Sequence, residues 1–390
     1  MDSDKKRIYL DYAATTPVAK EVLEAMLPYF TERFGNPSSV HKKGQEAKRA
    51  LLEARKKVAQ LLNCQPREII FTSGGTESDN LALRGVINAA KKEGRDHLIV
   101  SKIEHPAVLK TAQSLEKEGF KVDYLSVNKE GIVNLKELEK LITEKTALVS
   151  IMYANNEIGT IEPISEISKL IKQKNPETLF HTDAIQAFNY LDCQVKELGV
   201  DLLSLSGQKI YGPKGVGLLY QKQGIRLIPQ QSGGEQENGL RAGTENLPGI
   251  IGLVKAMELV DGSRTTESKR LSVLRDQLIE GIRTQIKGTH LNGSREKRLP
   301  NNLNFCFSSI EGEALVMSLD IQGVMGSTAS ACSSAKLEPS HVLLALGLKP
   351  ELAQGSLRLT LGKSTTSNDI DYVLEIIPAI VERLRSISSL

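Results

Sequence analysis

Short apolar runs alternate with amphipathic helical patterns between residues 69 and 206 of this 390-residue chain. The apolar runs predict strands at 68–71, 97–100, 121–125, 147–152, 179–182 and 202–205, and the intervening patterns predict helices at 78–90, 107–117 and 164–173. Such strand–helix alternation is typical of a mostly parallel sheet with helices on both faces. Ligands of such sheets bind in the loops that follow the carboxyl ends of the strands.

The pattern changes in the last third of the chain. A long helical stretch at 247–287 is followed by strands at 303–307 and 355–361 and helices at 313–320 and 369–385. This mixture predicts a smaller α+β domain, because 390 residues exceed one ordinary core. We expect a large domain at 15–260 and a small domain at 261–390, with residues 1–14 packed on the small one.

Composition narrows the class of protein. Hydrophobic residues make up 40% and charged residues 25%, which is typical of a soluble globular protein. The net charge is only +3 without a concentrated basic patch, which argues against direct binding of nucleic acid or a membrane. No signal peptide or membrane-length apolar run occurs. The cysteines are widely separated, so no metal site is expected and a cytoplasmic location is predicted; they are Cys64, Cys193, Cys306 and Cys332.

Two turns carry residues suited to holding a phosphorylated carbonyl cofactor. Gly75 and Thr76 lie between a predicted strand and helix, where close backbone approach and free N–H groups suit a phosphate. Lys209 follows another strand in a turn rich in Gly and Ser; it suits a Schiff base, and Ser206 suits the phosphate. Taken singly, the first is also compatible with a plain turn and the second with a solvated lysine.

Two further residues follow predicted strands. Asp183 ends a strand, where its carboxylate suits a protonated pyridine nitrogen, although it would also cap a helix well. His105 precedes a helix; it suits stacking on a flat cofactor or proton transfer, but it also fits a surface histidine. Neither residue decides the function alone.

Cys332 and Arg358 add a thiol and a guanidinium. Small residues surround Cys332, which predicts a mobile loop whose thiol reaches both a buried substrate and an outside acceptor; a buried gap-filling cysteine is the alternative. Arg358 lies in a predicted strand and suits a bidentate grip on an α-carboxylate, or it is simply exposed. Together these residues match pyridoxal phosphate (PLP) chemistry on an amino acid.

These motifs, in this order, resemble the group I cysteine desulfurases of the NifS and IscS type, which are class V relatives of the aminotransferases. The resemblance extends over nearly the whole chain and includes Ser-Ala-Cys-Ser-Ser-Ala around Cys332. It implies the PLP-dependent transferase fold type I, with a mostly parallel seven-stranded sheet in the large domain. The matching stretches are Tyr9 to Pro17, Gly35 to Ser39, Thr72 to Asn80, Asn155 to Thr160, Ile210 to Gly217, Arg241 to Thr244, Leu337 to His341 and Leu359 to Gly362.

The resemblance also assigns roles toward PLP. Lys209 would bind it covalently and move the substrate Cα proton, Asp183 would face the pyridine nitrogen, and Gln186 the phenolic oxygen. His105 would stack on the ring. Gln208 stands where the family usually has a histidine that touches the phosphate or the ring. The phosphate would be held by Gly75, Thr76, Ser206 and Gln208, with Thr244 donated by the other subunit of a homodimer.

Toward the substrate L-cysteine, Arg358 and Asn156 would hold the carboxylate. Cys332 would take the sulfur, which leaves alanine and a persulfide for iron–sulfur cluster assembly or for thiolation of tRNA or cofactors. The acceptor protein is left open. An aminotransferase, a selenocysteine lyase and a non-catalytic family member remain alternatives; Cys332 argues against the first, and intact Lys209, Asp183 and Arg358 against the last.

Overall fold

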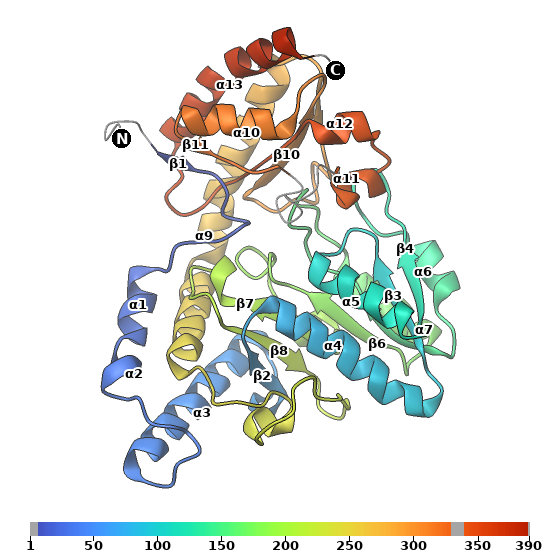
Figure 1. Cartoon of the computed structure of the whole chain (residues 1–390), viewed down its shortest axis with the longest axis vertical. Coiled ribbons are helices and arrows are strands. Elements are labelled where there is room, and N and C mark those ends of the chain that lie inside the picture. The colour runs from blue at the N-terminus through green and yellow to red at the C-terminus, as the bar shows by residue number, and fades with distance from the viewer. Residues whose placement is uncertain (1–6, 329–338, 389–390) are drawn as a thin grey trace.

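The computed structural model describes residues 7–328 and 339–388 and has a larger and a smaller part joined by one long helix (Figure 1). The larger part contains a seven-stranded sheet of order β2-β8-β7-β6-β5-β3-β4. Every strand runs parallel except β8, which is antiparallel to both neighbours, so the predicted mostly parallel sheet is confirmed. The strands are β2 (Ile69–Thr72), β3 (His97–Ser101), β4 (Lys121–Leu125), β5 (Thr146–Ser150), β6 (Leu179–Asp183), β7 (Leu202–Ser206) and β8 (Gly217–Gln221).

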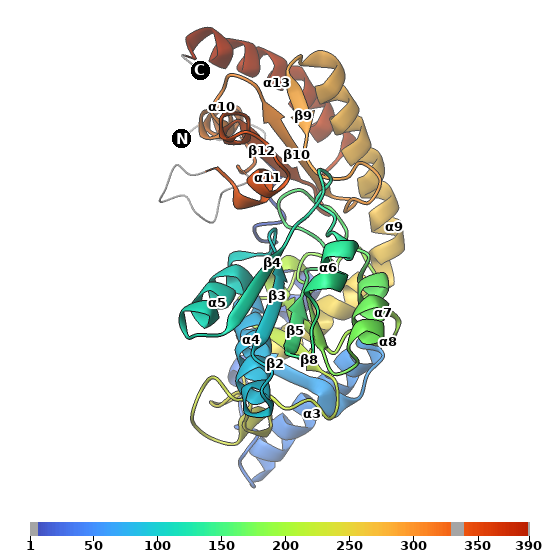
Figure 2. The same ribbon diagram turned by 90° about the vertical axis from the view of Figure 1, so that its right-hand side faces the viewer.

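Helices cover both faces of this sheet (Figure 2). Alternate strand residues feed two separate cores: Ile70 packs with α4 and α5, whereas Ile69 and Phe71 pack on the opposite face. The first face is covered by α4 (Gly75–Ala90) and α5 (Pro106–Lys117), and the second by α3 (Lys42–Leu62), α6 (Leu135–Leu141), α7 (Ile164–Lys174), α8 (Val195–Leu198) and the first half of α9 (Leu247–Gln285).

The smaller part is built on a three-stranded antiparallel sheet, β12-β10-β9. The N-terminal strand β1 (Ile8–Tyr9) pairs with β11 (Val324–Met325) and packs into the same core. The other elements are α10 (Gly312–Ile321), α11 (His341–Ala345), α12 (Pro350–Gln354), α13 (Ser367–Ile387), β9 (Thr289–Leu291), β10 (Asn302–Phe307) and β12 (Ser356–Thr360).

Helix α9 is 39 residues long and connects the larger and the smaller part. Its buried side chains up to Val260 belong to the larger core, and those from Leu271 onward belong to the smaller core. The boundary predicted at 260/261 therefore falls inside one continuous helix and stays a prediction. Within the described residues, no helix is long and apolar enough to cross a bilayer.

The local structure differs from the prediction at two places. Helix α4 begins at Gly75 rather than 78, since Gly74 adopts φ of 153° and turns the chain into the helix. The sequence predicts ranges for six of the seven expected strands, and β8 is the one without a range, because an antiparallel strand needs no crossover helix before it. The remaining short elements are α1 (Lys20–Met26), α2 (Pro28–Thr31), η1 (Pro66–Glu68), η2 (Lys91–Glu93), η3 (Gly207–Lys209) and η4 (Gln236–Gly239).

A buried ion pair fixes the loop around η4 to the large domain. Arg55 of α3 pairs with Glu237 at 2.6 Å, and the amide of Phe71 donates to the same carboxylate at 2.9 Å. Glu237 is only 5% exposed and adopts φ of 48°, so its backbone is strained to reach these partners.

We predict that Glu237→Gln lowers the free energy of unfolding by about 3 kcal/mol, because the Arg55 guanidinium loses its buried counter-charge. Urea titration followed by circular dichroism measures the change. Glu53→Gln is the matched control. Glu53 lies in α3, as Arg55 does, but its pair with Lys56 is exposed. Equal losses in the two variants would contradict the prediction.

Candidate active site

A cavity of about 240 Å³ opens at the carboxyl edge of the large sheet. Its walls come from the loops after β2, β3, β5, β6 and β7, from the N-terminal segment and from β12. Ten of the predicted site residues meet there although they are far apart in the sequence. The lining consists of Ala13, Ala14, Gly75, Thr76, His105, Met152, Asn156, Asp183, Ile185, Gln186, Ser206, Gln208, Lys209 and Arg358.

One end of the cavity is shaped for an anion. Gly75 and Thr76 form the first turn of the 16-residue helix α4, whose amide groups and dipole favour negative charge. Ser206 ends β7 beside them. A side chain at Gly75 would place its Cβ 2.0 Å from Ile185 Cδ1, so the Ile185 side chain would have to move to admit it.

Lys209 lies in the turn η3 directly after β7. Its Nζ donates a hydrogen bond to the carbonyl of Ala14, and Asn189 Nδ2 donates to the Lys209 carbonyl at 2.7 Å. Thr16 donates from both its amide and its hydroxyl to the carbonyl of Gln208, at 2.9 and 3.0 Å. The N-terminal segment therefore fixes the backbone that presents the lysine to the cavity.

Asp183 and His105 also line the cavity. Burial raises the pKa of Asp183 to about 6, although the amide of Ile185 donates to its carboxylate at 2.9 Å. Burial and the charge of Lys209 lower the pKa of His105 to about 4, so its ring is neutral. Its Nδ1 accepts from the amide of Ala107 at 3.1 Å, which assigns the proton to Nε2.

Arg358 of β12 brings a guanidinium to the cavity lining. Its Nη2 pairs with Asp11 at 2.8 Å and its Nη1 donates to the carbonyl of Asn156 at 3.0 Å. Its Nε has no hydrogen-bond partner among the described residues although the residue is only 4% exposed. Such a buried orphan donor is unfavourable unless a ligand completes it.

A group of buried polar residues that the sequence did not predict lies beside Asp183. His181, two residues earlier on β6, accepts or donates on both ring nitrogens, to Ser150 at 2.8 Å and Ser204 at 3.0 Å. Asp79 of α4 lies 3.7 Å from His181, and neither of its oxygens has a hydrogen-bond partner among the described residues. Its place in the stretch Thr72 to Asn80 was the one available signal.

The charges in this group follow from burial. Burial and the charge of Asp183 raise the pKa of Asp79 well above its usual range. Burial lowers the pKa of His181 to about 3 and raises that of Glu104, which accepts from the amide of Met152, to about 8. Burial therefore favours the neutral forms of Asp79, His181 and Glu104, whereas the pKa of Asp183 is raised less than that of Glu104.

Two predicted residues are not among those that line the cavity. Thr244 is exposed and does not line this cavity, so its proposed service to a second subunit stays a prediction. Cys332 lies outside the described residues.

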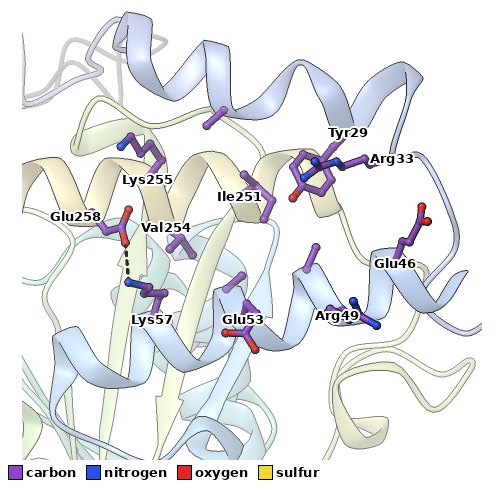
Figure 3. Close-up of a pocket in the computed structure, with 13 residues that line it drawn as sticks. Tyr29, Arg33, Glu46, Arg49, Glu53, Lys57, Ile251, Val254, Lys255 and Glu258 are labelled. Atoms are coloured by element: carbon purple, nitrogen blue, oxygen red, sulfur yellow. Dashed lines mark ion pairs between the residues drawn. The ribbon is translucent and has the colours of Figure 1, made fainter. Parts of the chain in front are cut away.

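A larger cavity of about 640 Å³ lies between α2, α3 and α9 and contains no predicted residue (Figure 3). Its side chains carry both charges, with Lys57 and Glu258 paired at 3.5 Å, and they do not converge on one point.

Comparison with known proteins places this geometry in a family. The model of the family "Aminotransferase class-V" matches residues 8–373. "Cysteine desulfurase IscS" of Clostridium botulinum strain Hall is 54% identical over 387 residues, which cover 99% of this chain and 97% of that relative. A solved NifS-like protein superposes with a TM-score of 0.91 at 41% identity, with 97% of this chain and 100% of that chain covered. SspA in complex with cysteine gives a TM-score of 0.81 at 37% identity, with coverage of 91% and 99%.

The fold is that of the type I PLP-dependent transferases, as the resemblance implied. The chain belongs to the class V aminotransferase family and, within it, to the cysteine desulfurases. The family assignment from sequence is thus confirmed, whereas the roles of the individual residues stay predictions.

We predict that Asp79→Asn stabilises the protein increasingly as the pH rises from about 4 toward 7. The folded protein is most stable with Asp79 protonated, because the pKa of this acid is higher in the folded than in the unfolded state. The wild type therefore loses stability as the pH rises above the pKa of the unfolded state, by up to about 1.4 kcal/mol per pH unit. Asparagine does not ionise and removes this loss.

Urea unfolding of both proteins at several pH values, in the same cofactor state, measures the difference between them. A difference that does not change with pH would show that Asp79 is not held neutral. Glu104 titrates in both proteins, so its contribution largely cancels, whereas the difference includes the coupling between Asp79 and Asp183.

Proposed function

We propose that the chain is a PLP-dependent cysteine desulfurase that takes the sulfur from L-cysteine and transfers it to Cys332. The observation that carries the proposal is the convergence of Lys209, Asp183 and Arg358 on one cavity in a member of the cysteine desulfurase family. SspA, which is similar over 91% of this chain, was solved with cysteine bound, and this supports the same substrate here.

The residues present fit PLP. The amides at the start of α4, with Thr76, Ser206 and Gln208, would hold the phosphate, and Lys209 would bind the carbonyl carbon. Asp183 would face the pyridine nitrogen, Gln186 the phenolic oxygen and His105 the ring. When bound, PLP supplies an electron sink that makes the substrate Cα proton removable and the sulfur electron-poor.

The protein's own groups divide the remaining tasks. A protonated pyridine nitrogen facing Asp183 would favour the ionised form of its carboxylate. Lys209 would move the proton at the substrate Cα. Arg358 and Asn156 would hold the substrate carboxylate; the unpartnered Nε of Arg358 supplies one donor, and Asp11 must share the guanidinium.

Sulfur transfer to Cys332 conserves atoms and electrons. The Cβ–S bond of the substrate breaks and an S–S bond to Cys332 forms. The thiol proton ends on the substrate carbon, so the products are alanine and a Cys332 persulfide. A thiolate is the nucleophile that this step requires. The persulfide would then pass to an acceptor protein in iron–sulfur cluster assembly or thiolation.

Two further features belong to the proposal. Thr244 is exposed, and the amide of the neighbouring Gly243 donates to the side chain of Gln236 in η4. An exposed and anchored Thr244 supports its service to the cavity of a second copy in a homodimer. Cys64, Cys193 and Cys306 are free thiols, which supports a reducing cytoplasm as the place of action.

We predict that Lys209→Ala loses the visible absorbance of the lysine-bound cofactor and lowers turnover at least about 10³-fold, because it removes both the covalent link and the proton-transferring amine. Absorbance spectra and an alanine assay measure the two effects. Lys214→Ala, in the same turn region but outside the cavity lining, is the control. Retention of both properties in Lys209→Ala would refute the assignment.

We predict that Cys332→Ala still binds PLP and L-cysteine but releases almost no alanine, because no thiol receives the sulfur. Mass spectrometry after incubation with L-cysteine should find one added sulfur on Cys332 in wild type. Cys306→Ala is the matched control, since this buried thiol is 0% exposed. Keto acid in place of alanine would instead favour an aminotransferase.

A further inference from the structure

Arg358 shares its guanidinium between two acceptors of the protein itself. Its Nη1 donates to the backbone carbonyl of Asn156 at 3.0 Å, and its Nη2 pairs with the carboxylate of Asp11 at 2.8 Å. Asp11 belongs to the N-terminal segment and is not among the residues that line the cavity. A carboxylate of the protein therefore lies against the group to which the proposed function assigns the substrate carboxylate.

The donors that remain on Arg358 define where a ligand carboxylate binds. A guanidinium carries five N–H groups in a rigid plane, and Nε with Nη2 forms one of its two-donor edges. Nε has no hydrogen-bond partner among the described residues, although Arg358 is buried. A carboxylate that grips this edge uses Nε and the second hydrogen of Nη2. It thus meets Asp11 at the same nitrogen.

The position of Arg358 does not depend on Asp11. The backbone of Arg358 lies within β12, where it pairs with Asn304 of β10 on one side and with Ser327 on the other. The carbonyl of Asn156 holds Nη1 independently. Removal of the Asp11 charge is therefore expected to leave the guanidinium in place.

The N-terminal segment is also attached without this ion pair. The backbone of Asp11 forms a parallel bridge with Thr360, and the amide of Ala13 donates to the Thr360 hydroxyl at 2.9 Å. The hydroxyl of Tyr9 donates to the Asp11 carbonyl at 3.0 Å. The carboxylate thus projects from a fixed backbone, and what it adds is a negative charge beside Arg358.

We propose that Asp11 is a specificity-determining residue that lowers the affinity of the site for α-carboxylates. Its negative charge stays beside Arg358 when a ligand carboxylate binds, and it opposes the charge of the ligand. The inference rests on the proposed function, because it takes Arg358 as the site of the substrate carboxylate.

Attraction and repulsion act together on a carboxylate at this site. Arg358 attracts it with one positive charge, and Asp11 repels it with one negative charge. Arg358 is buried, so water screens its attraction little, whereas the side chain of Asp11 is 19% exposed and is screened more. The attraction therefore exceeds the repulsion, and a carboxylate binds, but more weakly than it would bind to Arg358 alone.

A weakened grip on the carboxylate suits a reaction whose substrate and product share this group. L-cysteine and L-alanine carry the same α-carboxylate and α-amino group and differ only in the sulfur. Each contact to the carboxylate therefore holds the product as firmly as the substrate. Asp11 lowers both affinities, which speeds the release of alanine and raises the concentration of L-cysteine needed for half-saturation.

The test measures ligand binding to the holoenzyme through the change in cofactor absorbance. L-alanine is the probe with a carboxylate, and ethylamine is the same molecule without it. Asp11→Asn keeps the shape of the side chain and removes its charge, whereas Asp11→Glu keeps the charge. Asp11→Ser is a second neutral variant that keeps the test decisive if Asp11→Asn does not fold. Steady-state kinetics with L-cysteine give KM and kcat for each variant.

We expect both neutral variants to bind L-alanine about three- to tenfold more tightly than wild type, because a neighbouring like charge at a partly screened position is removed. The KM for L-cysteine should fall by a similar factor. The kcat should not rise, since the carboxylate is gripped alike before and during the reaction. Binding of ethylamine should not change, and Asp11→Glu should resemble wild type.

Asp276→Asn is the matched control. It removes the same carboxylate from an ion pair with Arg295, of 2.6 Å, that lies outside the cavity lining. Its affinities for L-alanine and ethylamine should equal those of wild type. The control therefore separates the effect of a charge beside Arg358 from the effect of net charge.

Three results would overturn the inference. Weaker binding of L-alanine by the neutral variants would show that Asp11 orients the guanidinium instead. Unchanged binding, including no binding by any of the proteins, would show that its charge does not act on the site. An equal gain for ethylamine would place its effect on the amino group. The proposed function survives each of these results if wild type forms alanine from L-cysteine, and it fails if wild type forms none, so the two failures are distinguishable.

Discussion

The parallel register of β3, β5, β6 and β7 brings the carboxyl ends of four strands to one edge of the sheet. Asp183 pairs with Ser204 in this register, so β7 continues two residues further to Ser206 and its turn. Because this turn carries Lys209, the amine and the carboxylate face one cavity while belonging to different strands. The other residues that line the cavity lie around this edge of the sheet.

Electrostatics beside this edge depend on burial more than on the number of acids. Asp79, Glu104 and Asp183 are all buried, and burial raises the pKa of each, which favours the neutral acids. Burial also lowers the pKa of His181, so its neutral ring adds a dipole and no charge beside Asp183. A cation in the cavity would favour the ionised form of Asp183.

The sequence predicted the residues of this site better than it predicted their support. Lys209, Asp183 and His105 were found because each follows a strand whose apolar run is plain. Asp79 was missed because a polar residue inside a helix usually faces solvent, and only the packing of α4 on the sheet buries it.

Direction and distant pairing were also hidden from the sequence. The run Gly217–Gln221 predicts no orientation, because a strand pattern is the same in both directions. The pair of Asp11 with Arg358 joins the N-terminal segment to β12, and no local periodicity reports such a contact. A hydrogen bond from Ser340 to Glu157 is hidden for the same reason.

Arg358 joins the N-terminal segment to the cavity wall. Its guanidinium contacts Asp11 and the carbonyl of Asn156, and its backbone pairs with Ser327. The same N-terminal segment accepts a hydrogen bond from Lys209 Nζ at the Ala14 carbonyl. A carboxylate bound at the guanidinium would compete with Asp11 for the same positive charge, which would weaken the contact with this segment. Occupation of the guanidinium would thereby be linked, through Asp11 to Ala14, to the position of the Lys209 amine.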